Sequence, residues 1–436
     1  MPPAPLPFSG KSRRTTDSPI SFYIQKALDN PDMISLAAGL VDEPSLPCEE
    51  VAEAVRAIMA NPAAGRAALQ YGSTQGLASL RERVLDLVCT ADGVKPSDIG
   101  LSPDNVVLTT GSQQLLYLLG EVLFDPGDIV ITEAPSYFVY HSLLQSKGAR
   151  VVTVPMDDGG LDLDALESLL MKLERSGELG RVKLIYTVDY FQNPTGLTLA
   201  ADRRPRLVEL ARRFSRHHRI IVLEDAAYRE VRFTGNDIPS VKRFDERNEH
   251  VVYASTFSKP LSPGLKTGYA LMPRDLVEPM MHLKSSHDFG STNLAQHVID
   301  RIMETGVYRR HVLRLRDVYR EKCDLMLLSL KREFRDWPDV SWTVPAGGLF
   351  LWLRFPEEFD AGPNGSLSDA ALQAGILFVP GEFAHVPDES GRVPRNEVRL
   401  CFGVVEPRQI PEAIRRLRAA CRGLETPRRK VLAGAV

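Results

Sequence analysis

Short apolar runs alternate with longer segments of helical spacing in the central part of the chain. Helical segments are expected after the first five runs, and a loop rich in Pro and Gly follows the sixth. Such alternation predicts a mostly parallel sheet with helices on both faces, whose ligands bind at the carboxyl ends of the strands. The six runs are NVVLTT (105–110), DIVITE (128–133), RVVTVP (150–155), VKLIYTV (182–188), RIIVLED (219–225) and VVYAST (251–256).

The segments before this region predict two amphipathic helices. One covers 49–60, with its apolar residues on one face and acids in its first turn. The second lies near 77–88, after a loop that contains LQYGSTQG. Closer to the N-terminus, SFYIQKAL predicts a short helix, and MISLAAGL ends in small residues around Gly39. Small residues there either let the backbone approach a ligand or form a turn into the first domain.

The C-terminal third of the chain predicts a second, smaller domain. Helices are expected at 292–304 and 307–332, then two strands in SWTVPAGGLFLWLRF, two more in ILFVPG and EVRLCFG, and a closing helix at 411–421. The predicted fold class is α/β, a large domain with a mostly parallel central sheet flanked by helices, plus a smaller α+β C-terminal domain. The expected organisation is a flexible arm (1–17), an N-terminal segment with the large domain (18–312), the small domain (313–424) and a flexible tail (425–436).

The composition is that of an ordinary soluble globular protein. Of 436 residues, 44% are hydrophobic and 25% charged, and 53 basic against 56 acidic residues give a net charge of -3. This balance argues against nucleic acid as a partner, and no window approaches the ~18 apolar residues of a membrane span. The N-terminus lacks the apolar run of a secretory signal, and five scattered cysteines without CxxC spacing predict free thiols, with no disulfide or metal site. We therefore expect a cytoplasmic protein.

A polar cluster follows five of the six predicted strands. The clusters are GSQQ, the SY of APSY, FQNPTG, EDAAY and TFSK. Because the carboxyl ends of parallel strands meet at one edge of a sheet, we expect these clusters to converge on a single ligand site.

The last cluster, within VVYASTFSKPLSPGLKTGY (251–269), suits a covalently held cofactor. Lys259 stands at the mouth of a strand, where partial desolvation lowers the pKa of a lysine and makes its neutral amine a nucleophile. The hydroxyls of Thr256 and Ser258 and the cation of Lys266 suit a bound phosphate. A Schiff-base lysine beside a phosphate site indicates pyridoxal phosphate, although a lysine in a turn is, taken alone, most often a solvated surface residue.

Taken in order, GSQQ, PSY, FQNPTG, EDAAY and TFSKPLSPGLKTGY resemble the aspartate aminotransferase superfamily of pyridoxal phosphate enzymes, fold type I. The likeness covers Ser18 to Cys421 and is greatest to the class I/II branch with 2-aminoadipate and kynurenine aminotransferase-like proteins. NPTG, Asp-x-x-Tyr and SK also stand at matching separations. The resemblance implies an aminotransferase that moves the amino group of an L-amino acid to a 2-oxo acid, such as 2-oxoglutarate, through a pyridoxal/pyridoxamine phosphate ping-pong cycle.

The resemblance also implies catalytic roles. Lys259 would form the Schiff base with pyridoxal 5'-phosphate and shuttle the proton between the substrate Cα and C4′ of the cofactor. Asp225 would pair with the pyridine nitrogen and keep it protonated. Asn193 and Tyr228 would donate to the phenolic oxygen, and Tyr137 would stack on the ring.

Further residues are implied to bind phosphate and substrate. Tyr71 matches a tyrosine that, in this family, reaches the phosphate from the partner subunit, which implies a homodimer with shared active sites. Arg399 would bind the substrate α-carboxylate in a bidentate manner, and Gly39 and Asn193 would lie beside it. The implied phosphate site comprises Gly111, Ser112 and Gln113 at a helix N-terminus, with Thr256, Ser258 and Lys266.

Two positions depart from the family pattern. Lys266 stands where the family usually has arginine, so the charge is kept but the planar two-donor group is lost, and we expect looser phosphate binding. Asp189 and Tyr190 precede FQNPTG where proline is common, and Asp189 is expected near the rim of the site without an assigned role.

Other functions are open at this stage. The same residues serve β-lyases, racemases and ring-forming synthases, so fold and cofactor do not fix the reaction. A non-catalytic alternative is the aminotransferase-like ligand-binding domain of some bacterial transcription regulators, but we expect no room for a DNA-binding domain ahead of Gly39. The motifs GxGxxG after a strand, the Walker lysine, GxSxG and HExxH are absent from the sequence.

The N-terminal segment bears on the choice of substrate. Ser21, Phe22 and Tyr23 resemble the substrate-lining stretch of this branch, and no arginine stands there to hold a distal carboxylate. We therefore expect an apolar or aromatic amino donor, with 2-oxoglutarate or pyruvate as acceptor.

Overall fold

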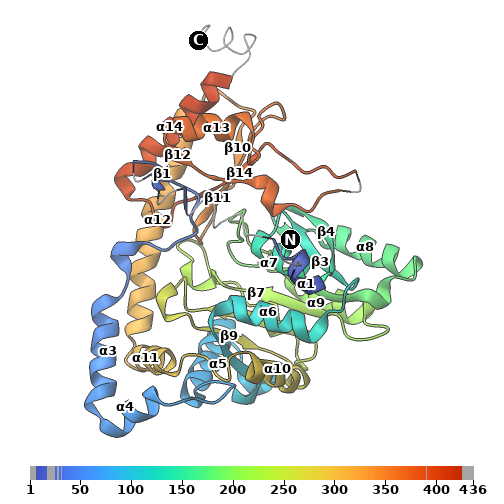
Figure 1. The fold of residues 1–436 in the computed structure, drawn as a ribbon, viewed down its shortest axis with the longest axis vertical. Coiled ribbons are helices and arrows are strands. Elements are labelled where there is room, and N and C mark those ends of the chain that lie inside the picture. Colours follow the sequence, from blue (N-terminus) through green and yellow to red (C-terminus); the bar gives the residue numbers. More distant parts are fainter. Residues whose placement is uncertain (1–5, 17–24, 27–28, 31, 389, 425–436) are drawn as a thin grey trace, which may run out of the picture.

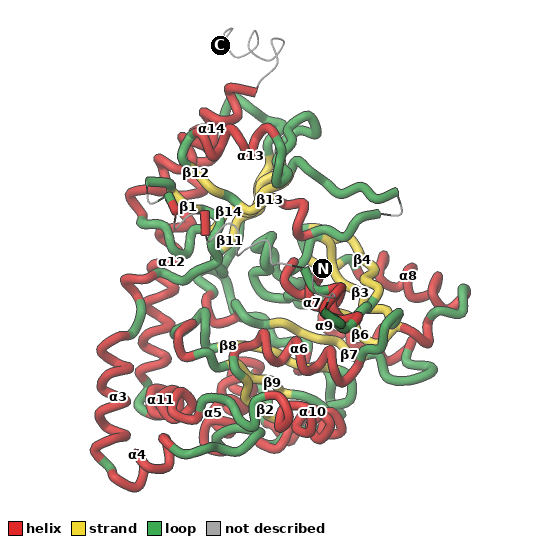
Figure 2. The backbone as a smooth tube through the Cα atoms, viewed as in Figure 1, coloured by secondary structure: helices red, strands yellow, loops and turns green. Residues whose placement is uncertain are grey.

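The computed structural model describes residues 6–16, 25–26, 29–30, 32–388 and 390–424 (Figure 1). Its central sheet consists of β2 (Val106–Thr109), β3 (Ile129–Ala134), β4 (Arg150–Asp157), β5 (Gly160–Leu161), β6 (Val182–Thr187), β7 (Ile221–Asp225), β8 (Val251–Thr256) and β9 (Gly268–Leu271). The strand order is β2-β9-β8-β7-β6-β3-β4-β5 (Figure 2). The pairs from β4 through β3, β6 and β7 to β8 are parallel, whereas β9 lies antiparallel between β2 and β8. The predicted mostly parallel sheet is therefore confirmed.

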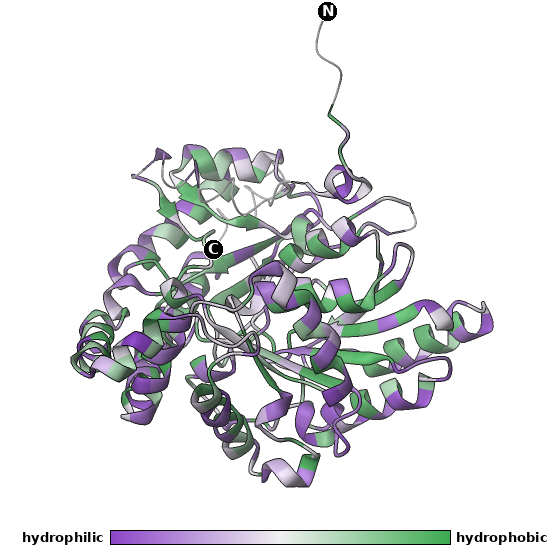
Figure 3. Ribbon diagram, turned by 60° about the horizontal axis from the view of Figure 1, so that its bottom comes forward, coloured by the Kyte–Doolittle hydropathy of each residue, from purple (hydrophilic) through white to green (hydrophobic). Residues whose placement is uncertain are grey.

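Helices cover both faces of this sheet, because successive side chains of a strand point to opposite faces. On β3, Ile129 and Ile131 pack with α8 (Leu163–Arg175) and α9 (Arg203–Phe214). Val130 packs on the opposite side, with the core that contains α5 (Ala78–Asp92), α6 (Gly111–Leu123) and α7 (Phe138–Lys147). Burial on both faces explains the near-continuous apolar runs. Figure 3 shows these strands as green interior arrows among helices with purple outer sides.

Several elements differ from the sequence prediction. The prediction of a helical segment after β7 is wrong. The described residues there form only two short 3₁₀ helices, η5 (Arg229–Val231) and η6 (Lys242–Phe244), before β8. The turn-forming stretch TGNDIPS (234–240) breaks helical spacing between them. By contrast, α3 (Cys48–Ala60) confirms the first amphipathic helix, and α4 (Pro62–Leu69) adds a helix where a loop was expected.

The C-terminal unit is built on a second, antiparallel sheet. It contains β10 (Ser341–Trp342), β11 (Phe350–Arg354), β13 (Val379–Pro380) and β14 (Glu397–Cys401), in the order β10-β11-β14-β13. The helices α13 (Ser366–Gln373) and α14 (Ile410–Leu424) pack against each other beside it. In Figure 1 this unit lies above the large sheet.

Two segments join the units. The long helix α12 (Val307–Glu333) packs against α11 (Asn293–Glu304) in the large unit and against α14 in the C-terminal one, so the predicted boundary near 313 falls inside a helix. The strand β1 (Ile34–Ser35) pairs with β12 (Ile376–Leu377), which carries the following residues, through Gly39, across to the edge of the large sheet. Further helices are α1 (Gly10–Arg14), within the predicted arm, and α10 (Arg274–His287).

Candidate active site

A cavity of about 300 Å³ lies at the carboxyl edge of the large sheet, between it and the C-terminal unit. The polar clusters that follow five strands converge here, as predicted from the strand order. Every predicted site residue except Tyr71 lines this cavity. They are Gly39, Gly111, Ser112, Gln113, Tyr137, Asn193, Asp225, Tyr228, Thr256, Ser258, Lys259, Lys266 and Arg399.

The N-terminus of α6 lines one part of the cavity. No side chain caps this helix, so its first N–H groups remain available to a ligand. Gly111 has a φ of 68°, and a Cβ placed on Gly268 of β9 would lie 2.5 Å from the backbone of Gly111 and Ser112. Only glycine at position 268 therefore lets the strand approach this turn so closely. The Thr256 hydroxyl donates to Ser258 Oγ at 2.9 Å, and both residues line the cavity.

Lys259 follows β8 and projects into the cavity. Its Nζ donates to the carbonyl oxygen of Gly39 at 2.8 Å, and no carboxylate pairs with it among the described residues. Burial lowers the pKa of Lys259 to about 8, and the nearby charges of Arg399 and Lys266 act in the same direction. A lysine in this state is far more available as a neutral nucleophile near neutral pH than an ordinary surface lysine.

Asp225 ends β7 and is 5% exposed. Its Oδ2 accepts the Tyr186 hydroxyl at 2.9 Å, and its Oδ1 accepts the Ala227 N–H at 3.3 Å. Burial raises the pKa of Asp225 to about 6, while the two hydrogen bonds lower it. Within the part of the chain that the structure describes, no cation pairs with this carboxylate, so it can hold a protonated ring nitrogen.

Arg399 enters the cavity from β14 of the C-terminal unit and is 2% exposed. Its Nη1 donates to Asn193 Oδ1 at 2.8 Å and its Nη2 to the Ala37 carbonyl at 2.6 Å. The guanidinium lies 4.3 Å from the ring centre of Phe350, and its Nε has no hydrogen-bond partner among the described residues. Burial lowers the pKa of Arg399. A buried cation with only neutral partners is suited to bind an anionic ligand.

Tyr71 and Asp189, which the sequence placed at or near the site, do not line this cavity. Tyr71 does not line the cavity of its own chain; it is 80% exposed, with its ring edge-on to Phe289 at 5.6 Å. Asp189 is not at the rim of the site, which corrects that expectation. It is fully buried and forms an ion pair with Arg204 of α9, because a carboxylate at that depth needs a cation.

Sequence reasoning missed two buried residues that support the site. Tyr186 holds Asp225, and Glu133 organises the segment that leads to Asn193. The Glu133 carboxylate accepts the Val188 N–H at 2.8 Å, the Thr187 hydroxyl at 2.8 Å and Gln192 Nε2 at 2.7 Å. Burial raises the pKa of Glu133 to about 7. The only sequence signal was a polar atom inside an otherwise apolar strand, which does not identify its partner.

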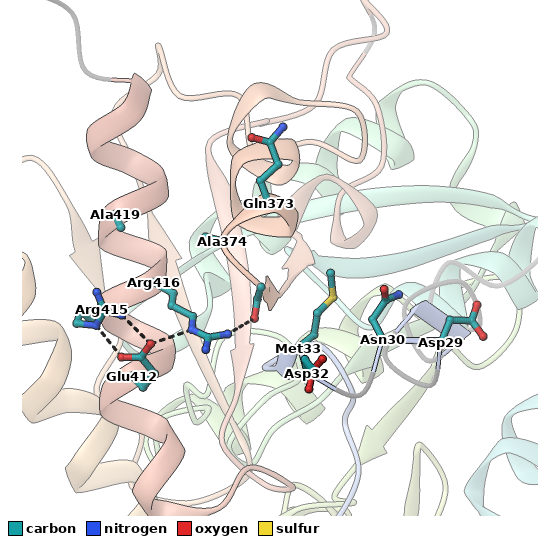
Figure 4. Close-up of a pocket in the computed structure, with 11 residues that line it drawn as sticks. Asp29, Asn30, Asp32, Met33, Gln373, Ala374, Glu412, Arg415, Arg416 and Ala419 are labelled. Carbon is teal, nitrogen blue, oxygen red and sulfur yellow. Dashed lines mark hydrogen bonds and ion pairs between the residues drawn. The ribbon is translucent and has the colours of Figure 1, made fainter.

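A second hollow, of about 740 Å³, lies between α14 and the segment around Met33 (Figure 4). The charged side chains of α14 pair with one another here, since Glu412 accepts hydrogen bonds from both Arg415 and Arg416 of its own helix. Arg416 also donates to the Gly375 carbonyl at 3.0 Å. This hollow shares no lining residue with the cavity of Lys259, and we assign it no function.

Three other properties of the described residues concern metal ligands, membrane-spanning helices and cysteines. In the described ranges, no group of three or more His, Cys, Asp or Glu side chains is arranged to hold a metal ion. None of the described helices combines the length and apolarity needed to cross a membrane. No disulfide joins the cysteines within the described ranges, and Cys48 alone of the five is exposed.

Comparison with known proteins decides the family. The model of the aminotransferase class I and II family matches residues 31–417. The chain belongs to the class I and II aminotransferases. An aromatic-amino-acid aminotransferase of Thermococcus litoralis is 34% identical over 395 residues, which covers 90% of this chain and 88% of that protein. The resemblance deduced from the motifs is thereby confirmed.

Solved aminotransferase structures share the fold. Pyrococcus horikoshii kynurenine aminotransferase, in complex with PMP and substrates, has a TM-score of 0.86 and 33% identity, and the match covers 96% of this chain and 98% of that one. LysN, the α-aminoadipate aminotransferase of Thermus thermophilus, complexed with N-(5'-phosphopyridoxyl)-L-leucine, has a TM-score of 0.81 and 33% identity, with 96% and 97% covered. The fold is aspartate aminotransferase-like, and the protein is an aminotransferase.

The cofactor of this aminotransferase is pyridoxal 5'-phosphate, and the cavity fits that molecule. The uncapped N-terminus of α6, with the bare backbone of Gly268 behind it, suits the phosphate. The unpaired carboxylate of Asp225 suits the ring nitrogen, and the amine of Lys259 suits the aldehyde. These three groups line the same cavity.

Proposed function

We propose that this aminotransferase moves the amino group of an apolar or aromatic L-amino acid to a 2-oxo acid, such as 2-oxoglutarate, by a ping-pong cycle. The observation that carries the proposal is the position of Arg399. Among the described residues this buried cation donates hydrogen bonds only to neutral groups, and it lines the same cavity as the reactive amine of Lys259. An α-carboxylate bound by Arg399 would bring the substrate amino group towards that lysine.

Lys259 is proposed as the Schiff-base lysine and as the general base and acid that moves the proton at the substrate Cα. Because the pKa of Lys259 is about 8, its amine can both accept and return a proton near neutral pH. Bound pyridoxal phosphate supplies a ring that accepts the electron pair left when the Cα–H bond breaks. Asp225 keeps the ring nitrogen protonated, which strengthens that acceptor.

The remaining residues are proposed to orient the cofactor and the substrate. Asn193 uses its oxygen to hold Arg399, which leaves its amide nitrogen free to donate to the phenolic oxygen of the cofactor. Burial raises the pKa of Tyr228 well above its usual value, so its hydroxyl stays a donor. The ring of Tyr137 stacks on the cofactor. Gly39 and Arg399 hold the α-carboxylate, and Gly111, Ser112, Gln113, Thr256, Ser258 and Lys266 hold the phosphate.

The choice of an apolar or aromatic donor follows from the cavity wall. Leu40, Phe138, Val139 and Phe350 line it. Its three described cations each have a proposed partner in the phosphate, the carboxylate or the cofactor aldehyde, and they are Lys259, Lys266 and Arg399. None remains for the distal carboxylate of an acidic donor, whereas apolar side chains gain free energy from burial against this wall.

An absorbance spectrum of the purified protein tests the proposal. A visible band near ~410–430 nm is expected for the bound cofactor, and its conversion to ~330 nm on addition of single amino acids identifies the donor. Phenylalanine and leucine are expected to convert the band faster than aspartate and glutamate. Strong preference for aspartate would overturn the donor class, and a missing band after reconstitution would overturn the function.

We also propose a homodimer in which Tyr71 reaches the partner's phosphate site. Tyr71, Leu69 and Phe289 are 80%, 69% and 61% exposed, an apolar group of side chains that a second copy would cover. Co-expression of Lys259→Ala and Tyr71→Ala chains tests this arrangement. Because a hybrid dimer would contain one wild-type site only if Tyr71 acts across subunits, activity above that of either homodimer is expected. Activity no higher than that of the two homodimeric variants would contradict it.

We also propose a cytoplasmic location, which cysteines outside disulfides favour.

A further inference from the structure

Tyr186 lies in the middle of the large sheet and contacts a proposed catalytic carboxylate. It belongs to β6, is fully buried, and pairs in register with Leu223 of β7. Leu223 and Asp225 are two residues apart on β7, so both side chains are on the face that Tyr186 occupies. From there the Tyr186 hydroxyl donates to Asp225 Oδ2 at 2.9 Å.

This hydrogen bond acts on a carboxylate with few other partners. The second protein donor to Asp225 in the described structure is the Ala227 N–H, at the longer distance of 3.3 Å. Burial raises the pKa of Tyr186 well above its usual value, which favours the protonated phenol that donates this hydrogen bond. A donor to a carboxylate favours its charged form and fixes its rotation.

We infer that Tyr186 is a positioning residue that orients Asp225 and keeps it ionised for the ring nitrogen of the cofactor. The inference rests on the proposed role of Asp225. Tyr186 does not line the cavity, so it acts through Asp225 and not on the substrate. Because its position on β6 is set by the sheet, it supplies a rigid second contact that a flexible loop residue would not.

Tyr140 of α7 offers a matched control. Its ring packs against that of Tyr186 with centroids 4.3 Å apart, and it is equally buried. Its hydroxyl has no hydrogen-bond partner among the described residues. Tyr140→Phe and Tyr186→Phe thus each remove one oxygen from the same buried pair of rings, but only the second removes a donor to Asp225.

The test measures the affinity of cofactor-free full-length protein for pyridoxal 5'-phosphate by absorbance titration. Tyr186→Phe is expected to bind the cofactor about tenfold more weakly than wild type, because it loses a hydrogen bond to a charged group. Tyr140→Phe is expected to stay within about twofold of wild type. In an Asp225→Ala background, Tyr186→Phe should cause no further loss, since its acceptor is gone.

A second readout is the pH dependence of cofactor affinity. The titratable groups whose own pKa values the charge of Asp225 raises are Glu133 of β3, Tyr137, Tyr140, Tyr186 and Tyr228, and of these Tyr186 lowers the pKa of Asp225 through its hydrogen bond. Loss of the Tyr186 donor raises the pKa of Asp225, so affinity should fall at a higher pH on acidification than in wild type. Glu133 is present in all three proteins, and its titration therefore cancels in the comparison.

The outcomes separate the inference from the proposed function. If wild type binds the cofactor and Tyr186→Phe matches it in affinity and pH profile, the positioning role is overturned. An equal loss in Tyr140→Phe, or an undiminished loss in the Asp225→Ala background, would also overturn it, because either result indicates a general packing effect. If wild type itself does not bind pyridoxal 5'-phosphate, the proposed function fails first.

Discussion

Two fully buried arginines in this aminotransferase have opposite surroundings. Arg204 of α9 lies beneath the large sheet, paired with Asp189 and 3.6 Å from Glu224, and its guanidinium lies 4.3 Å from the ring centre of Tyr190. Arg399 lies between the two units, and among the described residues its guanidinium donates hydrogen bonds only to an amide oxygen and a backbone carbonyl. The first charge is paired with a carboxylate of the fold, whereas the second has no carboxylate partner among the described residues, in keeping with the proposed role in substrate binding.

Two buried lysines also differ in whether a carboxylate pairs with them. Lys322 of α12 is 1% exposed, contacts Asp42 Oδ1 at 2.5 Å and donates to the Gly403 carbonyl at 2.7 Å. Lys259 donates to a single carbonyl oxygen, and burial lowers its pKa. Since burial of an unpaired charge is costly, such groups persist where a ligand completes the pairing. Burial alone therefore does not identify a functional cation; the absence of a carboxylate partner does.

The largest effect is expected from Lys259→Ala. The variant should lose the visible cofactor band and all detectable turnover, because the other described lysine that lines the cavity, Lys266, is assigned to the phosphate and not to the cofactor aldehyde. Turnover by the purified, reconstituted variant measures this effect. Lys322→Met is the matched buried-lysine control, which should lose stability but keep the cofactor band if it folds. Measurable turnover by Lys259→Ala would show that the assignment is wrong.

Arg399→Met should lower kcat/KM by about 10²–10³-fold, because one partner of a desolvated charge pair with the substrate carboxylate is removed. Its free energy of unfolding should equal or exceed that of wild type, since an unpaired buried charge is replaced by an apolar side chain. Steady-state kinetics and urea unfolding measure the two quantities. A large loss of stability with unchanged kcat/KM would mean that Arg399 has a structural role and does not bind the substrate.

Arg204→Met should show the converse behaviour. Removing the cation leaves Asp189 and Glu224 buried without their partner, which should lower the free energy of unfolding by about 3–5 kcal/mol. The folded fraction should keep its cofactor band and its KM, because Arg204 does not line the cavity. Denaturant unfolding monitored by circular dichroism measures the loss. If stability is unchanged, the pairing does not have the structural role given to it here.

The pH dependence of cofactor capture tests the state of Lys259. Its neutral amine is the nucleophile, and its pKa is about 8 in the unloaded site. The rate at which cofactor-free protein takes up pyridoxal phosphate should therefore fall about tenfold per pH unit below pH 8 and level off above it. Stopped-flow absorbance measures this rate. A break near the ordinary lysine pKa of 10.5 would mean that burial does not activate this amine.

The smallest effect is expected at Lys266, which is exposed at the rim of the cavity. Lys266→Ala should weaken cofactor binding about fivefold, with little change in kcat, because it removes one solvent-screened charge near the phosphate. Lys266→Arg should retain or improve the affinity, since it restores a planar donor pair. Equilibrium titration of cofactor-free protein compares the three. Unchanged affinity in Lys266→Ala would remove this residue from the phosphate site.

Periodicity predicted the large sheet, the carboxyl edge as the ligand site and the five polar clusters that converge there, whereas Gly39 and Arg399 were implied by the family resemblance. The reason is physical, since a strand buried on both faces must be apolar and residues after parallel strands must meet. By contrast, β9 was missed because GYAL is short and follows a loop rich in Pro and Gly, and its antiparallel pairing depends on strands far away in the sequence.

What only the tertiary structure decided is which charges are paired. The sequence contains Asp189, Arg204, Asp225 and Arg399 without indicating that the first two neutralise each other while the last two remain open to a ligand. It likewise does not indicate that Tyr186 supports Asp225 from a neighbouring strand. Pairing depends on distances between side chains that are far apart in the chain, and these distances are set by the packing of strands and helices.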